Sequence, residues 1–160
     1  MNFRIGNGYD VHALAEGETL WLGGILIEHY KGTVAHSDGD VLIHAVCDAM
    51  LGALALGDIG QHFPDTDQNF KNIDSKLLLK KCCELIIAEG YQIANIDSTI
   101  CAQKPKLMPH LPAMRKCMAE ILNIDINQVS IKATTTEKLG FVGREEGISS
   151  YAVILLQKIQ

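Results

Sequence analysis

The sequence lacks the marks of a secreted, membrane-spanning or nucleic-acid-binding protein. Its five cysteines are an odd number without a Cys-x-x-Cys pair, so they indicate neither a disulfide framework nor a thiolate zinc knuckle. No basic run exceeds two residues and the formal net charge is −5, which disfavours binding along a nucleic acid. The N-terminus has no apolar signal core, and Asp48 interrupts the most apolar stretch, residues 45–57. We therefore expect a cytoplasmic protein with no nucleic-acid or membrane partner.

Proline is scarce as well, with 4 residues, and 48% of the residues are hydrophobic, which excludes collagen-like, disordered and low-complexity classes. A chain of 160 residues fits one compact domain, so we expect residues 1–160 to form a single domain. The acidic excess is uneven. Residues 1–80 hold 5 Lys and Arg against 11 Asp and Glu, whereas residues 81–160 hold 9 against 8.

Apolar residues at three- and four-residue spacing predict three helices. They begin near Asp40, at Asp74 or Ser75, and near Leu111. Alternating and β-branched segments predict strands at residues 3–6, 20–22, 25–27, 91–102, 129–135 and 151–156. Asn7 and Gly8 are expected to loosen the first strand, and residues 32–40 are expected to form a flexible loop.

This order favours an α/β fold, specifically an α+β two-layer sandwich with a mixed sheet, helices on one face and a ferredoxin-like arrangement. A sheet covered on one side leaves its other face in need of a partner. We therefore expect an oligomer, and the pattern fits dimers and trimers alike.

A candidate metal site begins with Asp10 and His12, which point the same way on an extended segment. His44, at the start of the first expected helix, is a plausible third ligand. One carboxylate and two imidazoles with an open position are typical of catalytic zinc. The alternative, in which Asp10 caps a turn and His12 lies on the surface, stays open.

The segment between Lys31 and Lys71 contains six Asp and three His but no Lys or Arg. Such carboxylates repel one another unless solvent or bound cations neutralise them. A solvated acidic loop explains Asp65 and Asp67 well. It explains residues 36–40 less well, because a glycine lies there at the start of a helix.

Residues 132–141 combine three threonines, two lysines and Glu137 where a strand ends. Hydroxyls, exposed backbone N–H groups and lysines suit phosphate oxygens, and Glu137 could hold a hard cation. Threonine is also common in strands, so that reading stays open. Arg144 could reach an anion or merely pair with Glu145 and Glu146. Residues 102–106 could form an anion-binding loop, but for its lysines exposure to solvent is the favoured interpretation.

Five runs, taken together and in this order, resemble the 2-C-methyl-D-erythritol 2,4-cyclodiphosphate synthase family. They are Gly8–His12, Ala35–Val41, Leu56–Gly60, His62–Asp67 and Lys132–Phe141. The resemblance implies an enzyme of the non-mevalonate isoprenoid pathway. It would convert 4-diphosphocytidyl-2-C-methyl-D-erythritol 2-phosphate to the cyclic diphosphate and CMP by intramolecular phosphoryl transfer.

The resemblance also implies roles for individual residues. Asp10, His12 and His44 match zinc ligands, and Glu137 matches a contact to a second divalent cation, Mg²⁺ or Mn²⁺. His36 and Thr135 match the catalytic positions. The implied substrate contacts are Asp10, His12, His36, Ser37, Asp58, Ile59, Gly60, Phe63, Pro64, Asp65, Thr66, Asp67, Ala102, Gln103, Lys104, Pro105, Lys106, Leu107, Met108, Thr134, Thr135, Thr136, Glu137, Phe141 and Arg144.

The family is a homotrimer with active sites between subunits and a central channel that accepts isoprenoid diphosphates. Tyr9 and Tyr151 differ from the Phe and Glu associated with that channel in some members, so isoprenoid regulation is not expected here. Two other functions stay open: a noncatalytic nucleotide- or metal-binding module, and a zinc hydrolase that opens the diphosphate with water. The lack of a dedicated water-activating Glu near the zinc candidates disfavours the hydrolase.

Overall fold

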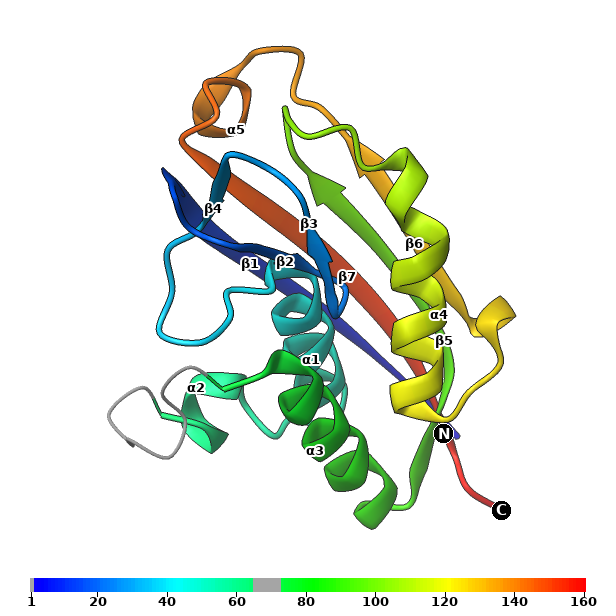
Figure 1. The fold of residues 1–160 in the computed structure, drawn as a ribbon. Helices are drawn as coiled ribbons and strands as arrows, with labels where there is room; N and C mark the ends of the chain where they lie inside the picture. Colours follow the sequence, from blue (N-terminus) through cyan, green and yellow to red (C-terminus); the bar gives the residue numbers. More distant parts are fainter. Residues whose placement is uncertain (1, 65–72) are drawn as a thin grey trace.

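The structure is a computed structural model that describes residues 2–64 and 73–160 (Figure 1). Within these residues, four strands come first and three helices follow, and strands and helices alternate only from the fifth strand onward. They are β1 (Phe3–Glu16), β2 (Leu20–Leu22), β3 (Ile25–Ile27), β4 (Lys31–Thr33), α1 (Val41–Ala53), α2 (Ile59–His62), α3 (Ser75–Ala88), β5 (Tyr91–Cys101), η2 (Met108–His110), α4 (Leu111–Leu122), η3 (Ile126–Gln128), β6 (Val129–Thr134), α5 (Gly140–Gly143) and β7 (Gly147–Lys158).

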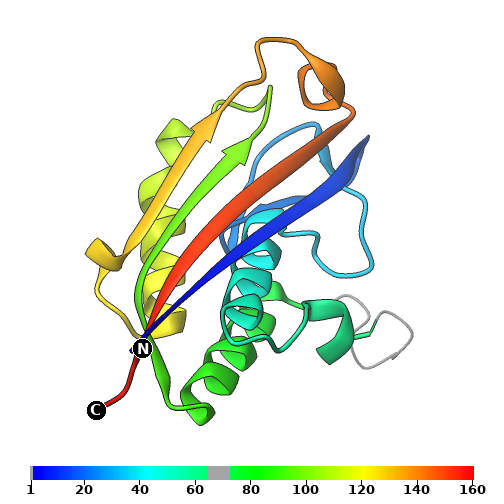
Figure 2. The same ribbon diagram turned by 180° about the vertical axis from the view of Figure 1, so that it is seen from behind.

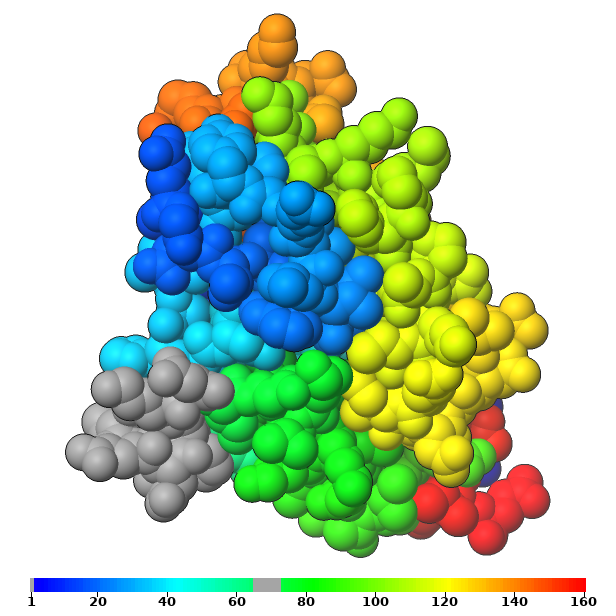
Figure 3. All heavy atoms as spheres, viewed as in Figure 1, coloured from blue at the N-terminus to red at the C-terminus, as the bar shows by residue number. Residues whose placement is uncertain are grey.

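Five strands form one mixed sheet in the order β4-β1-β7-β5-β6, and β2 and β3 form the expected hairpin. β5 and β6 run parallel, whereas the other neighbours are antiparallel. Helices α1, α3 and α4 cover one face, and the other face is open (Figures 1 and 2). From the covered side, the hairpin, α3 and α4 make up much of the surface (Figure 3). The mixed sheet with helices on one face is confirmed.

The finer, ferredoxin-like arrangement is not confirmed. A ferredoxin-like domain follows a βαββαβ order. Here α4 lies between β5 and β6, and β6 and β7 follow each other without a long helix between them. The chain therefore reaches the centre of the sheet with its last strand, β7, which lies between β1 and β5.

The loosening of the first strand expected at Asn7 and Gly8 is wrong, because β1 pairs with β7 without interruption from Phe3 to Ala13. Gly8 serves close packing instead of a turn. A Cβ built on Gly8 would lie 1.9 Å from the carbonyl oxygen of Ala45, and one on Gly6 would lie 1.8 Å from that of Ala49. The backbone of α1 therefore lies directly on β1. The last strand is longer than expected, since β7 runs from Gly147 to Lys158. Strand β4 was not expected, and it takes up part of the predicted loop.

We expect Gly8→Ala to destabilise the protein by at least about 1–3 kcal/mol, the usual range for overpacking, because the new methyl group would meet the backbone of α1. The matched control is Gly52→Ala in α1, where an added Cβ would have only one neighbour, at 3.8 Å, and where alanine favours the helix. Urea denaturation measures both variants. Equal stability of the Gly8 variant and the wild type would show that α1 does not approach β1 this closely.

Asp40 joins the hairpin to α1. Its side chain caps α1 by accepting a hydrogen bond from the Ile43 N–H (3.0 Å), and it also accepts from Gly23 (3.0 Å) and Gly24 (2.7 Å) in the turn between β2 and β3. Asp40 is fully buried. Burial raises the pKa of this carboxyl, and the three N–H donors act in the opposite direction.

The half of the open sheet face that β1 and β7 form is largely apolar, whereas on the other half Asp97 of β5 pairs with Lys132 of β6. Ile5, Tyr9 and Val11 of β1 and Tyr151 and Val153 of β7 alternate with residues that face the helices, and all five side chains are exposed. Tyr9 and Tyr151 are paired across the strands, with ring centroids 4.8 Å apart. A contiguous exposed apolar surface of this kind is typical of an interaction site. Within the described residues, no helix has the length and apolar character needed to cross a membrane.

Candidate metal centre and substrate clefts

Asp10, His12 and His44 converge in front of the sheet, as the spacing predicts. Asp10 and His12 both face the helices from β1, and His44 lies in the first turn of α1. The Asp10 Oδ2 atom is 3.1 Å from His12 Nε2 and 3.0 Å from His44 Nδ1, and the two ring nitrogens are 3.2 Å apart. In the described parts of the chain, these three residues are the group whose ligand atoms could hold a metal ion.

The donor set fits a tetrahedral cation. Metal–ligand bonds of about 2.0–2.1 Å at tetrahedral angles separate neighbouring ligand atoms by roughly 3.3 Å, close to the triangle formed by Asp10, His12 and His44. Three protein ligands leave a fourth position free. Carboxylate and imidazole ligands suit zinc.

The charge distribution of the site favours a cation. Burial raises the pKa of Asp10, but hydrogen bonds from His12 and His44 outweigh it and hold that pKa well below its usual range. Burial lowers the pKa of His44, but its hydrogen bond to Asp10 and the charges of Asp10, Asp40 and Asp38 outweigh this and raise the pKa. A proton on His44 therefore occupies the place that a metal ion would take.

Metal affinity should keep increasing with pH above 6.5, the ordinary pKa of histidine. A ligating imidazole must be neutral, and the raised pKa of His44 extends proton competition above that value. Titration with zinc in the presence of a competing chelator at several pH values between 5.5 and 8.5 measures this. An apparent affinity that stops rising at or below pH 6.5 would contradict the raised pKa.

A cavity of about 230 Å³ opens beside the three residues. It brings together eight of the residues expected at the site and three that the sequence did not single out, Ala35, Ile73 and Leu78. The expected ones are Asp10, His12, His36, Ser37, His44, Ile59, Gly60 and Phe63. We call this cavity the metal cleft.

Other expected residues of this region do not line the metal cleft. Asp58 caps α2 by accepting from the Gln61 N–H at 3.0 Å, and Pro64 follows Phe63 outside the lining. Asp65, Thr66 and Asp67 lie outside the described residues. Asp48 was not predicted to have a role near the site. Its Oδ1 accepts a hydrogen bond from the Ile59 N–H at 2.8 Å, which fixes the start of α2. The signal in the sequence was an acidic residue within a largely apolar helix.

A second cavity, of about 640 Å³, lies between the loop after β5 and strand β6. We call it the loop cleft. Its lining includes every residue expected in the range 102–108, together with Thr134 and Thr135, and adds Leu111 and part of β6. The lysines of this loop, which sequence reasoning favoured as merely solvated, thus border a cavity of substantial size.

Of the expected residues after β6, Thr135 lines the loop cleft, whereas Thr136 and Glu137 line neither cleft. Thr135 Oγ1 donates to Glu137 Oε1 at 3.1 Å, and Thr136 Oγ1 donates to the Leu139 carbonyl at 2.7 Å. Arg144 pairs with Glu146 (2.9 Å), one of the two surface pairs left open above. Neither Arg144 nor Phe141 lines either cleft in this chain.

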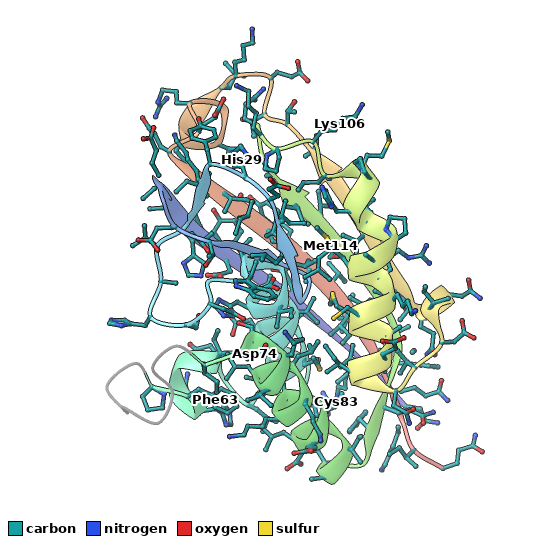
Figure 4. All side chains as sticks on the ribbon, in the orientation of Figure 1. His29, Phe63, Asp74, Cys83, Lys106 and Met114 are labelled. Carbon is teal, nitrogen blue, oxygen red and sulfur yellow. The ribbon has the colours of Figure 1, made fainter. Side chains whose placement is uncertain are left out.

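The two clefts of one chain face different parts of the molecule. In Figure 4, Phe63 of the metal cleft lies beside α2, whereas Lys106 of the loop cleft lies at the far end of the sheet, next to the start of α4. They share no lining residue. One chain therefore does not bring all the expected site residues together.

Comparison with known proteins agrees with the motifs. The profile of the YgbB family matches residues 3–157. The 2-C-methyl-D-erythritol 2,4-cyclodiphosphate synthase of Bacteroides fragilis is 62% identical over 159 residues, which cover 99% of this chain and 100% of that protein.

Solved structures agree too. The bifunctional IspDF of Campylobacter jejuni matches with a TM-score of 0.95 and 45% identity, over 99% of this chain and 43% of that one. IspF of Plasmodium falciparum in complex with CDP matches with a TM-score of 0.87 and 38% identity, over 99% of this chain and 98% of that one. The chain therefore belongs to the YgbB family, the 2-C-methyl-D-erythritol 2,4-cyclodiphosphate synthase family that its motifs resemble.

Proposed function

We propose that this protein is a cyclising phosphorus–oxygen lyase. It converts 4-diphosphocytidyl-2-C-methyl-D-erythritol 2-phosphate to 2-C-methyl-D-erythritol 2,4-cyclodiphosphate and CMP, in the non-mevalonate pathway to isoprenoid precursors. The observation that carries the proposal is the convergence of Asp10, His12 and His44 beside a cavity, in a chain 62% identical over 159 residues to a synthase of that name. Residues 1–160 act as one domain, and the enzyme works in the cytoplasm.

The reaction is an in-line phosphoryl transfer within one molecule. An oxygen of the 2-phosphate attacks the β-phosphorus, the bond from that phosphorus to the oxygen bridging to the α-phosphate breaks, and that oxygen leaves on CMP. Nucleophile and leaving group are both anionic, so positioning and charge neutralisation supply the catalysis instead of a strong base. When bound, zinc at Asp10, His12 and His44 and a second divalent ion, Mg²⁺ or Mn²⁺, at Glu137 supply positive charge that offsets the phosphate oxygens.

The chain's own groups hold the substrate. His36 and Ser37 border the metal cleft and donate to phosphate oxygens there, while Ile59, Gly60 and Phe63 shape the pocket for the methylerythritol. Asp58, Pro64, Asp65, Thr66 and Asp67 contribute further substrate contacts, as the resemblance implies. On the loop cleft, residues 102–108 and Thr134 read the cytidine, and Thr135 stabilises the transition state. Thr136, Phe141 and Arg144 contact the substrate phosphates from the turn after β6.

We further propose a homotrimer in which the metal cleft of one subunit meets the loop cleft of its neighbour. Two features support it: the substrate needs both clefts at once, yet they lie apart in one chain, and the open sheet face exposes a row of apolar side chains. Burying that face against other copies would bring the clefts of different chains together. The active site would then be complete only in the oligomer.

Val153→Asp should dissociate the oligomer and lower activity in parallel. Val153 faces outward from β7, the central strand, and is 40% exposed in the single chain; a carboxylate at a buried interface would be costly to desolvate. The matched control is Leu77→Asp on α3, where the side chain is 53% exposed. Analytical ultracentrifugation should find monomers only for the Val153 variant. If both variants remain trimeric, Val153 does not lie in the interface between subunits.

The activity itself is tested by incubating zinc-loaded protein with the cytidylyl substrate and Mg²⁺. CMP should be released in proportion to substrate consumed, and the reaction should stop in His36→Ala and Thr135→Ala. A noncatalytic binding module would bind CDP and zinc but release no CMP, and it would not change when these two residues are replaced. Absence of CMP release by folded, zinc-loaded trimer would overturn the proposal.

A further inference from the structure

The metal ligand His44 is held from behind by a buried serine. Its Nδ1 atom faces Asp10, and its Nε2 atom lies 2.9 Å from the hydroxyl oxygen of Ser75, the first residue of α3. Ser75 is completely buried. A second hydroxyl, that of Ser37, lies farther away, 3.3 Å from the same nitrogen.

The direction of the hydrogen bond between His44 and Ser75 follows from a third residue. The Ser75 hydroxyl donates a short hydrogen bond to Asp38 Oδ1. A hydroxyl has one proton to donate, so its oxygen must accept from His44 Nε2–H. The neutral ring then carries its proton on Nε2 and its lone pair on Nδ1, the atom that faces Asp10 and His12.

Asp38 is itself fixed in place. Its Oδ2 accepts from the backbone N–H of Ser75 at 2.8 Å, at the N-terminus of α3, where the helix dipole favours a carboxylate. Its Oδ1 also accepts from the Asp40 N–H at 3.2 Å, and its own N–H donates to the Ile73 carbonyl at 3.3 Å. Hydrogen bonds therefore connect the loop before α1 to the start of α3 behind His44.

We propose that Ser75, held by Asp38, is a positioning residue that selects the tautomer and ring orientation in which His44 binds the metal. The inference rests on the metal site of the proposed function. Such outer partners of ligating histidines typically change metal affinity by about 10–100-fold. Because Ser75 satisfies His44 Nε2, the hydroxyl of Ser37 remains free to donate toward the metal cleft, which Ser37 also lines.

The test compares zinc affinities by chelator competition. Ser75→Ala should bind zinc about 10–100-fold more weakly than the wild type, and Asp38→Asn should also bind more weakly. The double variant should lose little more than Ser75→Ala, because the two residues act through one chain of hydrogen bonds. The matched control is Ser98→Ala: this buried serine donates to a backbone carbonyl on β6 and should leave zinc affinity within about twofold of the wild type.

A spectroscopic readout separates positioning from general loss of structure. In the zinc-loaded wild type, the Nε2–H proton of His44 should exchange slowly with water, and this protection should disappear in Ser75→Ala while backbone amides of β1 remain protected. Equal zinc affinity and equal Nε2–H protection in Ser75→Ala and wild type would overturn the inference alone. If the wild type binds no zinc, the metal site of the proposed function fails as well, so the two failures are distinguishable.

Discussion

His44→Ala should abolish stoichiometric zinc binding and lower the cyclisation rate by about 10³-fold or more, since metal-assisted neutralisation of charge contributes several kcal/mol to such reactions. Of the three ligands, His44 is the most enclosed, with 5% of its surface exposed. Its loss removes one ligand and also leaves Asp10 without one of its two hydrogen-bond partners.

Zinc content by elemental analysis and CMP release measure these effects on the same preparation. The matched control is His29→Ala, which replaces a partly exposed histidine that packs on Tyr30 and lines neither cleft. It should retain zinc and activity. Sedimentation of the metal-free proteins shows whether the His44 variant still assembles. Full zinc content in that variant would remove His44 from the ligand set.

Asp40→Ala should cost at least about 3 kcal/mol of stability. The change leaves three N–H groups without their acceptor, from Gly23, Gly24 and Ile43, and each buried unsatisfied group costs about 1–3 kcal/mol. It also removes the cap of α1, the helix that carries His44. Thermal stability and zinc affinity should therefore fall together.

Asp40→Asn separates hydrogen bonding from charge. An amide keeps one acceptor oxygen and avoids burying a charge, so this variant should lose less stability than Asp40→Ala. Burial raises the pKa of Asp40 above its ordinary value of 3.8. The contribution of Asp40 to the free energy of unfolding should therefore decrease as pH rises from below 3.8 through the folded-state pKa. The Asn variant should lack that decrease. Urea denaturation from pH 3.5 to 7 measures both effects, with Asp125→Ala, at an exposed cap, as control. Equal losses in Asp40→Ala and Asp125→Ala would refute the account.

Local patterns predicted the features that depend on neighbours in sequence. A cap of α1 between Ser37 and Asp40, a cap of α3 at Asp74 or Ser75 and the shared direction of Asp10 and His12 were predicted from spacings of one to four residues. The structure has the caps at Asp40 and Asp74 and brings Asp10 and His12 together. The unbroken β1 was not predicted, because Asn-Gly usually marks a turn. Here Gly8 is needed for the approach of α1, a contact between segments far apart in the chain.

The support behind the metal ligands was also invisible to sequence reasoning. Ser75 contacts residues 31 and 37 positions away, His44 and Asp38, and no local motif connects them. The separation of the clefts was implied by the resemblance, through active sites between subunits, but no local pattern shows that residues 102–108 and Phe63 lie apart in one chain. The sequence left open whether Arg144 binds an anion or pairs with Glu145 and Glu146, and in the single chain it pairs with Glu146.

The most direct test of the proposed activity follows oxygen atoms. The zinc-loaded protein is given the cytidylyl substrate in water enriched in ¹⁸O, and the products are examined by ³¹P NMR and mass spectrometry. Intramolecular attack predicts a cyclic diphosphate and CMP, both without ¹⁸O from the solvent. A linear phosphorylated product that carries one ¹⁸O would contradict the account, because water instead of the substrate's own 2-phosphate would then be the nucleophile.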